Sequence, residues 1–203
     1  GAALAFKIRK EPRVAVSVVG DGGSSKGDFY GAINIAGAQK LPYVSVIVNN
    51  QWAISVPRSI QTGAKTLAQK GIAAGLECLQ VDGNDVIAVR AAMDFALKRA
   101  RHGHGGTVIE AVTYRLSDHT TADDARRYRG DDEVKAAWQR EPLKRLRNYL
   151  VALKAWDDAR EAAWKAQCEQ RVDVEVNAYL ESKPQPTEAM FDEFKAANKP
   201  AFI

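Results

Sequence analysis

Two short runs of β-branched apolar residues flank a stretch with helical periodicity, and this alternation constrains the fold more than any other feature of the chain. The runs cover residues 13–19 and 44–48, and each predicts a buried strand. Residues 28–40 lie between them with apolar side chains at i, i+3, i+4 and i+7, which predicts an amphipathic helix. The side chains expected to face inward are Phe29, Ala32, Ile33 and Ala36.

The alternation continues through the middle of the chain. We expect, in order, a helix, a strand, a helix and a strand over residues 65–74, 78–81, 85–101 and 107–112. The second of these helices is expected to turn four apolar side chains inward, Val86, Val89, Met93 and Leu97. Repeated strand–helix units with apolar strands predict an α/β fold, a doubly wound parallel sheet with helices on both faces.

The character of the sequence changes after residue 114. Residues 115–130 are polar and loop-like, whereas the following fifty or so residues are mostly helical. Three tryptophans in the helical part are expected either to pack between helices or to dock on a partner: Trp138, Trp156 and Trp164. We therefore expect a ligand-binding α/β domain over 1–130 and a helical C-terminal extension over 131–203. Residues 1–10 already read as the last turns of an amphipathic helix, so we expect a fragment that lacks its N-terminal part.

Composition narrows the classes of function. The 203 residues carry a net charge of +4, but basic and acidic residues are interleaved in the C-terminal half, which argues against a nucleic-acid-binding stripe. Cys78 and Cys168 lie far apart, as expected of reduced thiols in a bacterial cytoplasm or a mitochondrial matrix. No apolar run reaches the ~18 residues that cross a bilayer, so we expect no membrane association.

Two polar loops follow the first two predicted strands. They are Gly20–Ser25 and Asn49–Trp52. Carboxyl ends of neighbouring parallel strands meet at one edge of a sheet, where ligands bind. Asp21, expected on the loop surface, offers a carboxylate and Asn50 an amide oxygen, which are ligands that Mg²⁺ accepts while it holds a phosphorylated molecule. The glycines of the first loop let the backbone approach a phosphate, and its serines add hydroxyl donors.

Two other phosphate-binding motifs do not fit the first loop. A P-loop requires Gly-Lys-Ser/Thr, whereas Lys26 follows Ser25 and precedes Gly27. A dinucleotide-binding fingerprint requires glycine or alanine at the position of Ser25 and an acidic residue after the next strand, which here ends in asparagines. For either loop alone, an ordinary glycine-rich turn or asparagine turn is the alternative reading.

The amino-acid sequences of three segments resemble those of the E1 alpha subunit of 2-oxo acid dehydrogenase complexes, a subunit that depends on thiamine diphosphate and Mg²⁺. The segments are Gly20–Phe29, Asn49–Ser55 and His119–Asp124, and the resemblance extends over residues 1 to about 150. One departure is Lys26, where the family usually has glutamate. The resemblance implies that the whole N-terminal part of such a subunit precedes this chain.

Roles for individual residues follow from the resemblance alone. It implies that Mg²⁺ is held by the side chains of Asp21 and Asn50 and by the carbonyl of Trp52. It implies cofactor contacts from Gly20, Gly22 and Gly23 of the first loop, with the backbone N–H groups of Gly22 and Gly23 contacting the diphosphate. His119 matches a loop histidine near the diphosphate and the reacting centre, and Arg115 and Tyr128 match residues that order the same loop.

The resemblance also implies an activity and partners. The enzyme would decarboxylate a 2-oxo acid, most nearly pyruvate, and transfer the acyl group to the lipoyl group of E2 dihydrolipoyl acyltransferase. The alpha subunit would assemble with an E1 beta subunit in a heterotetramer. Three alternatives stay open: a branched-chain 2-oxo acid dehydrogenase, an acetoin dehydrogenase, or a catalytically silent subunit used for assembly.

Overall fold

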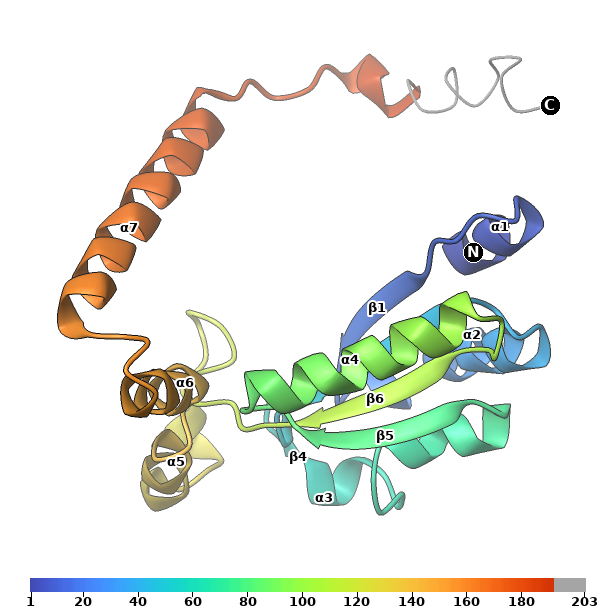
Figure 1. Ribbon diagram of the computed structural model, residues 1–203, viewed down its shortest axis with the longest axis horizontal. Helices are drawn as coiled ribbons and strands as arrows, with labels where there is room; N and C mark the ends of the chain where they lie inside the picture. The colour runs from blue at the N-terminus through green and yellow to red at the C-terminus, as the bar shows by residue number, and fades with distance from the viewer. Residues whose placement is uncertain (192–203) are drawn as a thin grey trace. The chain divides into compact units, whose positions relative to one another are not determined.

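A four-stranded parallel sheet organises the first part of the chain (Figure 1). Its strands are β1 (Ala15–Gly20), β2 (Tyr43–Asn49), β5 (Glu77–Asp82) and β6 (Thr107–Val112). They lie in the order β1-β2-β6-β5 and every pair is parallel, so all four carboxyl ends reach the same edge. The computed structural model describes residues 1–191, and its sheet confirms the predicted α/β fold.

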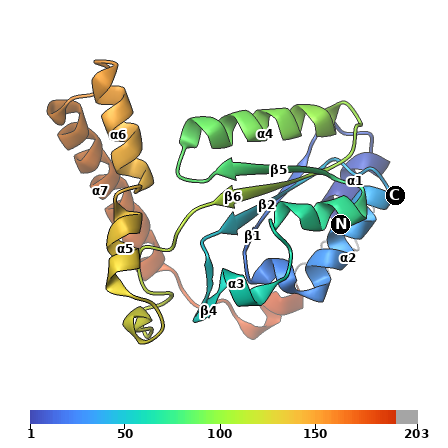
Figure 2. The ribbon, with the colours of Figure 1, turned by 90° about the horizontal axis from the view of Figure 1, so that it is seen from below.

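Helices cover both faces of this sheet (Figure 2). On one face lie α2 (Gly27–Ala38) and the 3₁₀ helix η2 (Ala68–Ala74). The core on that face includes Ile33, Ile47, Leu67 and Val108. On the other face lies α4 (Val86–Arg101), and the core there consists of Val44, Ala96 and Ile109 with their neighbours. The doubly wound arrangement is therefore confirmed.

Several side chains differ from the prediction because of their place in the sheet or helix. Val16 and Val18 are 47% and 69% exposed, since β1 is an edge strand and α4 packs on the other three strands. Val86 is 54% exposed because it opens the first turn of α4, ahead of the residues that face the core. Ala32 is exposed beside a narrow buried stripe on α2. The helix expected over 65–74 is a 3₁₀ helix that begins at residue 68.

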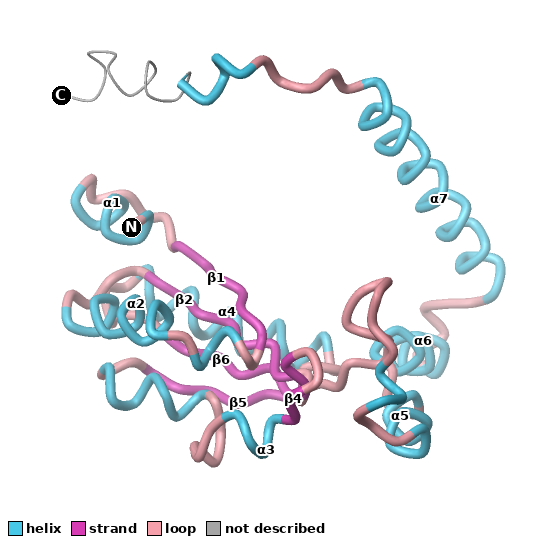
Figure 3. The backbone as a smooth tube through the Cα atoms, turned by 180° about the vertical axis from the view of Figure 1, so that it is seen from behind, coloured by secondary structure: helices cyan, strands magenta, loops and turns pink. Residues whose placement is uncertain are grey.

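Short elements surround the carboxyl edge of the sheet (Figure 3). A two-stranded antiparallel ribbon and a single helical turn follow β2; they are β3 (Trp52–Ala53), β4 (Val56–Pro57) and α3 (Arg58–Gln61). The 3₁₀ helix η1 (Gly23–Ser25) follows β1, and η3 (Ala125–Arg127) lies in the polar segment after β6. At the other end of the chain, α1 (Ala2–Ile8) precedes β1.

Two helices after the polar segment attach to the sheet edge. They are α5 (Asp131–Trp138) and α6 (Pro142–Ala152). Arg145 of α6 pairs with Asp82 and Asp85, which flank the turn between β5 and α4. The first compact unit accordingly runs from Gly1 to Leu150. The division of the chain after residue 130 into functional domains stays a prediction.

The second unit begins at Val151 and contains the long helix α7 (Asp158–Glu181) and the short η4 (Thr187–Phe191). Asp157 caps α7 by accepting a hydrogen bond from the N–H of Arg160 at 2.8 Å. Trp164 of this unit is 54% exposed and Trp138 of the first unit 51%, so neither is fully packed between helices, and docking on a partner stays a prediction for both. Within residues 1–191 we find no helix with the length and apolarity that a membrane crossing requires.

We expect Gly37→Ala to destabilise the fold by about 2–3 kcal/mol, because α2 and η2 meet at this glycine. A Cβ at Gly37 would lie 1.7 Å from the carbonyl oxygen of Ala74, so one backbone has to move. Gly31 of the same helix is the matched control, since a Cβ there meets nothing within 4 Å. Gly31→Ala should be neutral or stabilise the fold by up to about 1 kcal/mol. Urea unfolding measures both, and equal stabilities would contradict this packing.

Candidate functional site

The two polar loops meet where β1 and β2 end. Gly20, the last residue of β1, is aligned with Val48 of β2. The backbone N–H groups of Asp21 and Asn50 both donate to the carbonyl of Val48, at 3.2 and 3.1 Å. Because they share one acceptor, the two nitrogens cannot lie further apart than these two distances laid end to end. The structure thus brings Asp21 and Asn50 together.

Glycine is required at two positions of the first loop by close packing. A Cβ at Gly22 would lie 2.5 Å from the Cβ of Ala53, and one at Gly23 would lie 2.5 Å from a methyl of Val19. The first loop therefore touches the β3–β4 ribbon of the second. Within residues 1–191, the N–H groups of Gly22 and Gly23 donate to no backbone carbonyl, which leaves both for a ligand.

Asp21 is buried, not on the loop surface as expected. The residue is 2% exposed, and its Oδ2 accepts a hydrogen bond from Nε2 of Gln61 at 2.8 Å. Oε1 of Gln61 is buried and has no hydrogen-bond partner among the described residues. Gln61 was not predicted from the sequence, because it reaches the site from α3, forty positions along the chain.

A buried carboxylate in the sheet forms a hydrogen bond with the second loop. Glu110 of β6 is 1% exposed, and Oε1 accepts a hydrogen bond from the amide of Asn49 at 2.6 Å. Its Oε2 accepts from the N–H of Ala68 and from the amide of Gln80, each at 3.1 Å. Asn49 in turn accepts from the N–H of Gln51 at 3.2 Å. Glu110 therefore fixes the turn that presents Asn50.

Asn50 and Trp52 form a tight turn. Oδ1 of Asn50 accepts a hydrogen bond from the N–H of Trp52 at 3.1 Å, and Gln51 between them adopts a left-handed conformation with φ of 73°. The carbonyl of Trp52 accepts a long hydrogen bond of 3.3 Å from the Arg115 guanidinium. Both oxygens keep a lone pair, because a carbonyl or amide oxygen carries two.

The donor set of these loops suits a hard divalent cation. Asp21 contributes one carboxylate, and Asn50 and Trp52 each contribute a neutral oxygen, the ligand types that Mg²⁺ prefers beside phosphate oxygens. Among residues 1–191, no three His, Cys, Asp or Glu side chains gather into a metal-binding group. A site here would use a single carboxylate, which stays a prediction.

The serines of the first loop do not both serve as donors to a ligand. Ser24 is fully buried, and its hydroxyl donates to the carbonyl of Asp21 at 2.6 Å. That bond uses the one hydroxyl proton of Ser24, so the expectation that Ser24 would donate to a phosphate is wrong. Ser25 is exposed, and its hydroxyl proton has no such internal acceptor among the described residues.

The polar loop after β6 is tied to the second loop. Arg115 donates to the carbonyl of Ile54 at 2.8 Å and to the hydroxyl of Tyr128 at 2.7 Å. The ring of Tyr128 lies 5.5 Å from that of Trp52 between centroids. Asp123 accepts from the Tyr128 hydroxyl at 2.5 Å, and this hydrogen bond is the main cause of the lowered pKa of the Asp123 carboxyl.

His119 lies in this loop and is exposed. Its backbone N–H donates to Asp123 at 2.8 Å, which closes the loop on itself. Within residues 1–191 the His119 ring makes no hydrogen bond or ion pair with Asp21 or Asn50. The structure therefore links the loop of His119 to the second polar loop.

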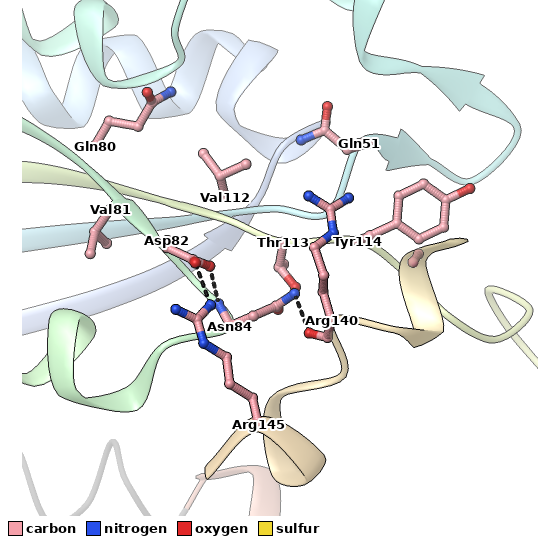
Figure 4. A pocket seen from close by; sticks show the side chains of 11 residues that line it. Gln51, Gln80, Val81, Asp82, Asn84, Val112, Thr113, Tyr114, Arg140 and Arg145 are labelled. Atoms are coloured by element: carbon pink, nitrogen blue, oxygen red, sulfur yellow. Dashed lines mark hydrogen bonds and ion pairs between the residues drawn. The ribbon is translucent and has the colours of Figure 1, made fainter. Parts of the chain in front are cut away.

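Two cavities open over the carboxyl ends of β5 and β6. The first, of about 540 Å³, is shown in Figure 4, where Arg145 points to Asp82 and Asn84 reaches the backbone carbonyl of Arg140. The second, of about 630 Å³, includes Trp52 in its lining. Neither is lined by Asp21 or Asn50, but Gln51 lines both cavities, and Asn49 and Trp52 also line the second, so both open against the second polar loop and neither touches the first.

Comparison with known proteins identifies relatives of the chain. Residues 1–188 match the family described as "Dehydrogenase E1 component". The chain is 51% identical over 163 residues to the pyruvate dehydrogenase E1 component subunit alpha of a Staphylococcus epidermidis strain and 50% identical over the same length to that of a Staphylococcus aureus strain. These alignments cover 79% of the chain but 44% of each relative, so the chain spans less than half the length of the curated relatives it matches.

Proposed function

The chain belongs to the dehydrogenase E1 component family, and from this premise we propose that it forms the diphosphate-binding part of the alpha subunit of a 2-oxo acid dehydrogenase. One observation carries the proposal. Asp21 and Asn50, from the loops after two neighbouring parallel strands, both donate a backbone N–H to the carbonyl of Val48, so their backbones lie side by side at the carboxyl edge of the sheet. That arrangement suits a metal ion that ties a diphosphate to the edge of the sheet.

We assign the cofactor contacts to the residues of these two loops. Asp21 and Asn50 would hold Mg²⁺ through their side chains and Trp52 through its carbonyl. Gly22 and Gly23 would donate their free N–H groups to the diphosphate, and Gly20, the last residue of β1, would lie next to these contacts. Thiamine diphosphate, when bound, supplies the carbon nucleophile and the electron sink that decarboxylation of a 2-oxo acid requires.

His119 is assigned to the reacting side of the site. An imidazole can donate a hydrogen bond to a phosphate or move a proton during acyl transfer. The hydrogen bond from Arg115 to the carbonyl of Trp52 and the ring contact between Tyr128 and Trp52 hold the segment that carries His119 next to Trp52. A hinge in this segment would bring the ring to the cofactor, as lids do when they exclude water.

We propose pyruvate as the substrate and a lipoyl group of E2 dihydrolipoyl acyltransferase as the acyl acceptor, because the relatives are named as pyruvate dehydrogenase subunits. The alpha subunit would assemble with an E1 beta subunit in a heterotetramer. This assignment puts the protein in a bacterial cytoplasm, or in the mitochondrial matrix of a eukaryote. A branched-chain 2-oxo acid, acetoin and a silent assembly role are the outcomes that compete with it.

The full-length alpha subunit, co-expressed with its beta subunit, tests the proposal. With thiamine diphosphate and Mg²⁺, we expect kcat/KM for pyruvate to exceed that for branched-chain 2-oxo acids and acetoin by at least about tenfold, a difference of about 1.4 kcal/mol in the transition state. A reversed preference would replace pyruvate with the better substrate. Cofactor binding without turnover of any substrate would establish the assembly role instead.

A further inference from the structure

A buried lysine contacts the turn to which we assign the diphosphate. Lys70 of η2 is 6% exposed. Its ammonium group donates to the carbonyl of Ser24 at 2.8 Å, to the hydroxyl of Ser24 at 2.9 Å and to the hydroxyl of Ser25 at 3.2 Å. All three ammonium hydrogens are therefore directed at the turn Gly23–Ser25, which follows the free N–H groups of the glycines.

The positive charge of Lys70 has no ion-pair partner within residues 1–191, since all three of its acceptors are neutral oxygens. Burial is the main cause of its lowered pKa, with Arg58 adding to the effect, whereas Asp21 and Glu110 oppose it from a distance. The ring of Tyr30, 5.5 Å from the ammonium nitrogen, adds a weak cation–π contact.

A buried charge without an ion pair costs several kcal/mol of folding free energy, and an apolar side chain of the same length would avoid that cost. An anion bound at the same turn would offset it. The N–H groups of Gly22 and Gly23, which donate to no backbone carbonyl within residues 1–191, directly precede the serines that Lys70 binds. A negatively charged ligand at this turn would therefore offset the folding free energy that burying the charge of Lys70 costs.

Resting on the function proposed above, we propose that Lys70 is a positioning residue for the diphosphate. Its three hydrogen bonds hold the turn in place, and its charge attracts the anion that the glycine N–H groups would bind. Ser24 extends this arrangement, because its hydroxyl accepts from Lys70 and donates to the carbonyl of Asp21. One lysine thereby steadies both the diphosphate turn and the residue assigned to the metal.

The experiment separates the charge of Lys70 from its hydrogen bonds. In the full-length alpha subunit assembled with its beta subunit, thiamine diphosphate affinity is measured by calorimetry at saturating Mg²⁺ for Lys70→Arg, Lys70→Gln and Lys70→Met. We expect Lys70→Met and Lys70→Gln to weaken binding by about 10–100-fold, the range of a hydrogen bond made by a charged group, and Lys70→Arg by less than about fivefold. Lys26→Met, an exposed lysine beside the same turn, is the control and should change affinity by less than about twofold.

A second ligand distinguishes the electrostatic role from a structural one. Thiamine monophosphate carries less negative charge, so the loss caused by Lys70→Gln should be smaller for it than for thiamine diphosphate. Wild-type affinity of Lys70→Gln, or equal losses for the two ligands, would overturn the inference. Asp21→Asn in parallel tests the function itself: if it loses cofactor binding while the Lys70 variants bind normally, only the role of Lys70 fails, and if it binds normally the proposed function fails.

Discussion

Replacing Asp21 with asparagine is expected to weaken Mg²⁺-dependent binding of thiamine diphosphate by at least about 100-fold, or about 2.8 kcal/mol. Asp21 is the one carboxylate in the assigned metal site, so the change removes the only negative charge that the protein offers the ion. Asparagine is preferable to alanine because Asp21 is 2% exposed and accepts a hydrogen bond from Gln61, which an amide oxygen retains. The fold should therefore survive the change.

Calorimetric titration of the assembled protein with thiamine diphosphate, at several Mg²⁺ concentrations, measures this effect. Asp28→Asn serves as the control, since Asp28 is exposed in the first turn of the helix that follows the same loop. Its affinity should stay within about twofold of wild type, because a solvated charge is screened. Normal Mg²⁺ dependence in Asp21→Asn would remove Asp21 from the metal site and with it the proposed cofactor geometry.

The strands of this fold were predictable because their information is local. The runs at 13–19, 44–48 and 107–112 are apolar and β-branched, and each forms a strand close to those bounds. The order β1-β2-β6-β5 depends on pairing between distant segments, which no local pattern encodes. Exposure of Val16 and Val18 follows from that order, since β1 is an edge strand and α4 packs on the other three strands.

The same distinction separates the predicted site residues from those that were missed. Asp21 and Asn50 were predicted because each directly follows a strand. Gln61, Lys70 and Glu110 were not, because each reaches a loop that lies forty or more positions away in the chain. Glu110 did leave a signal, as a lone carboxylate inside the apolar strand β6. A charged residue in a buried strand needs partners, and here its partners belong to the site.

Glu110→Met is expected to lower the free energy of unfolding by about 3 kcal/mol, because it leaves buried donors without an acceptor at about 1–3 kcal/mol each. Methionine keeps the approximate length of the side chain, so the change removes the acceptors with little change of volume. The orphaned groups are the amide of Asn49 and the N–H of Ala68. Gln80 is exposed and can turn to water.

Urea unfolding of Glu110→Met, Glu110→Gln and Glu77→Met gives the comparison. Glutamine retains an acceptor for Asn49, so Glu110→Gln should lower the free energy of unfolding by about half as much as Glu110→Met. Glu77 lies on neighbouring β5 with a 3.8 Å ion pair to Arg99 at the surface, and its removal should cost no more than about 1 kcal/mol. Because Asn49 carries the turn of Asn50, Glu110→Gln should also weaken Mg²⁺-dependent cofactor binding by about tenfold, as changes behind a metal ligand do. Stability lost with unchanged cofactor affinity would make Glu110 a residue of the core alone.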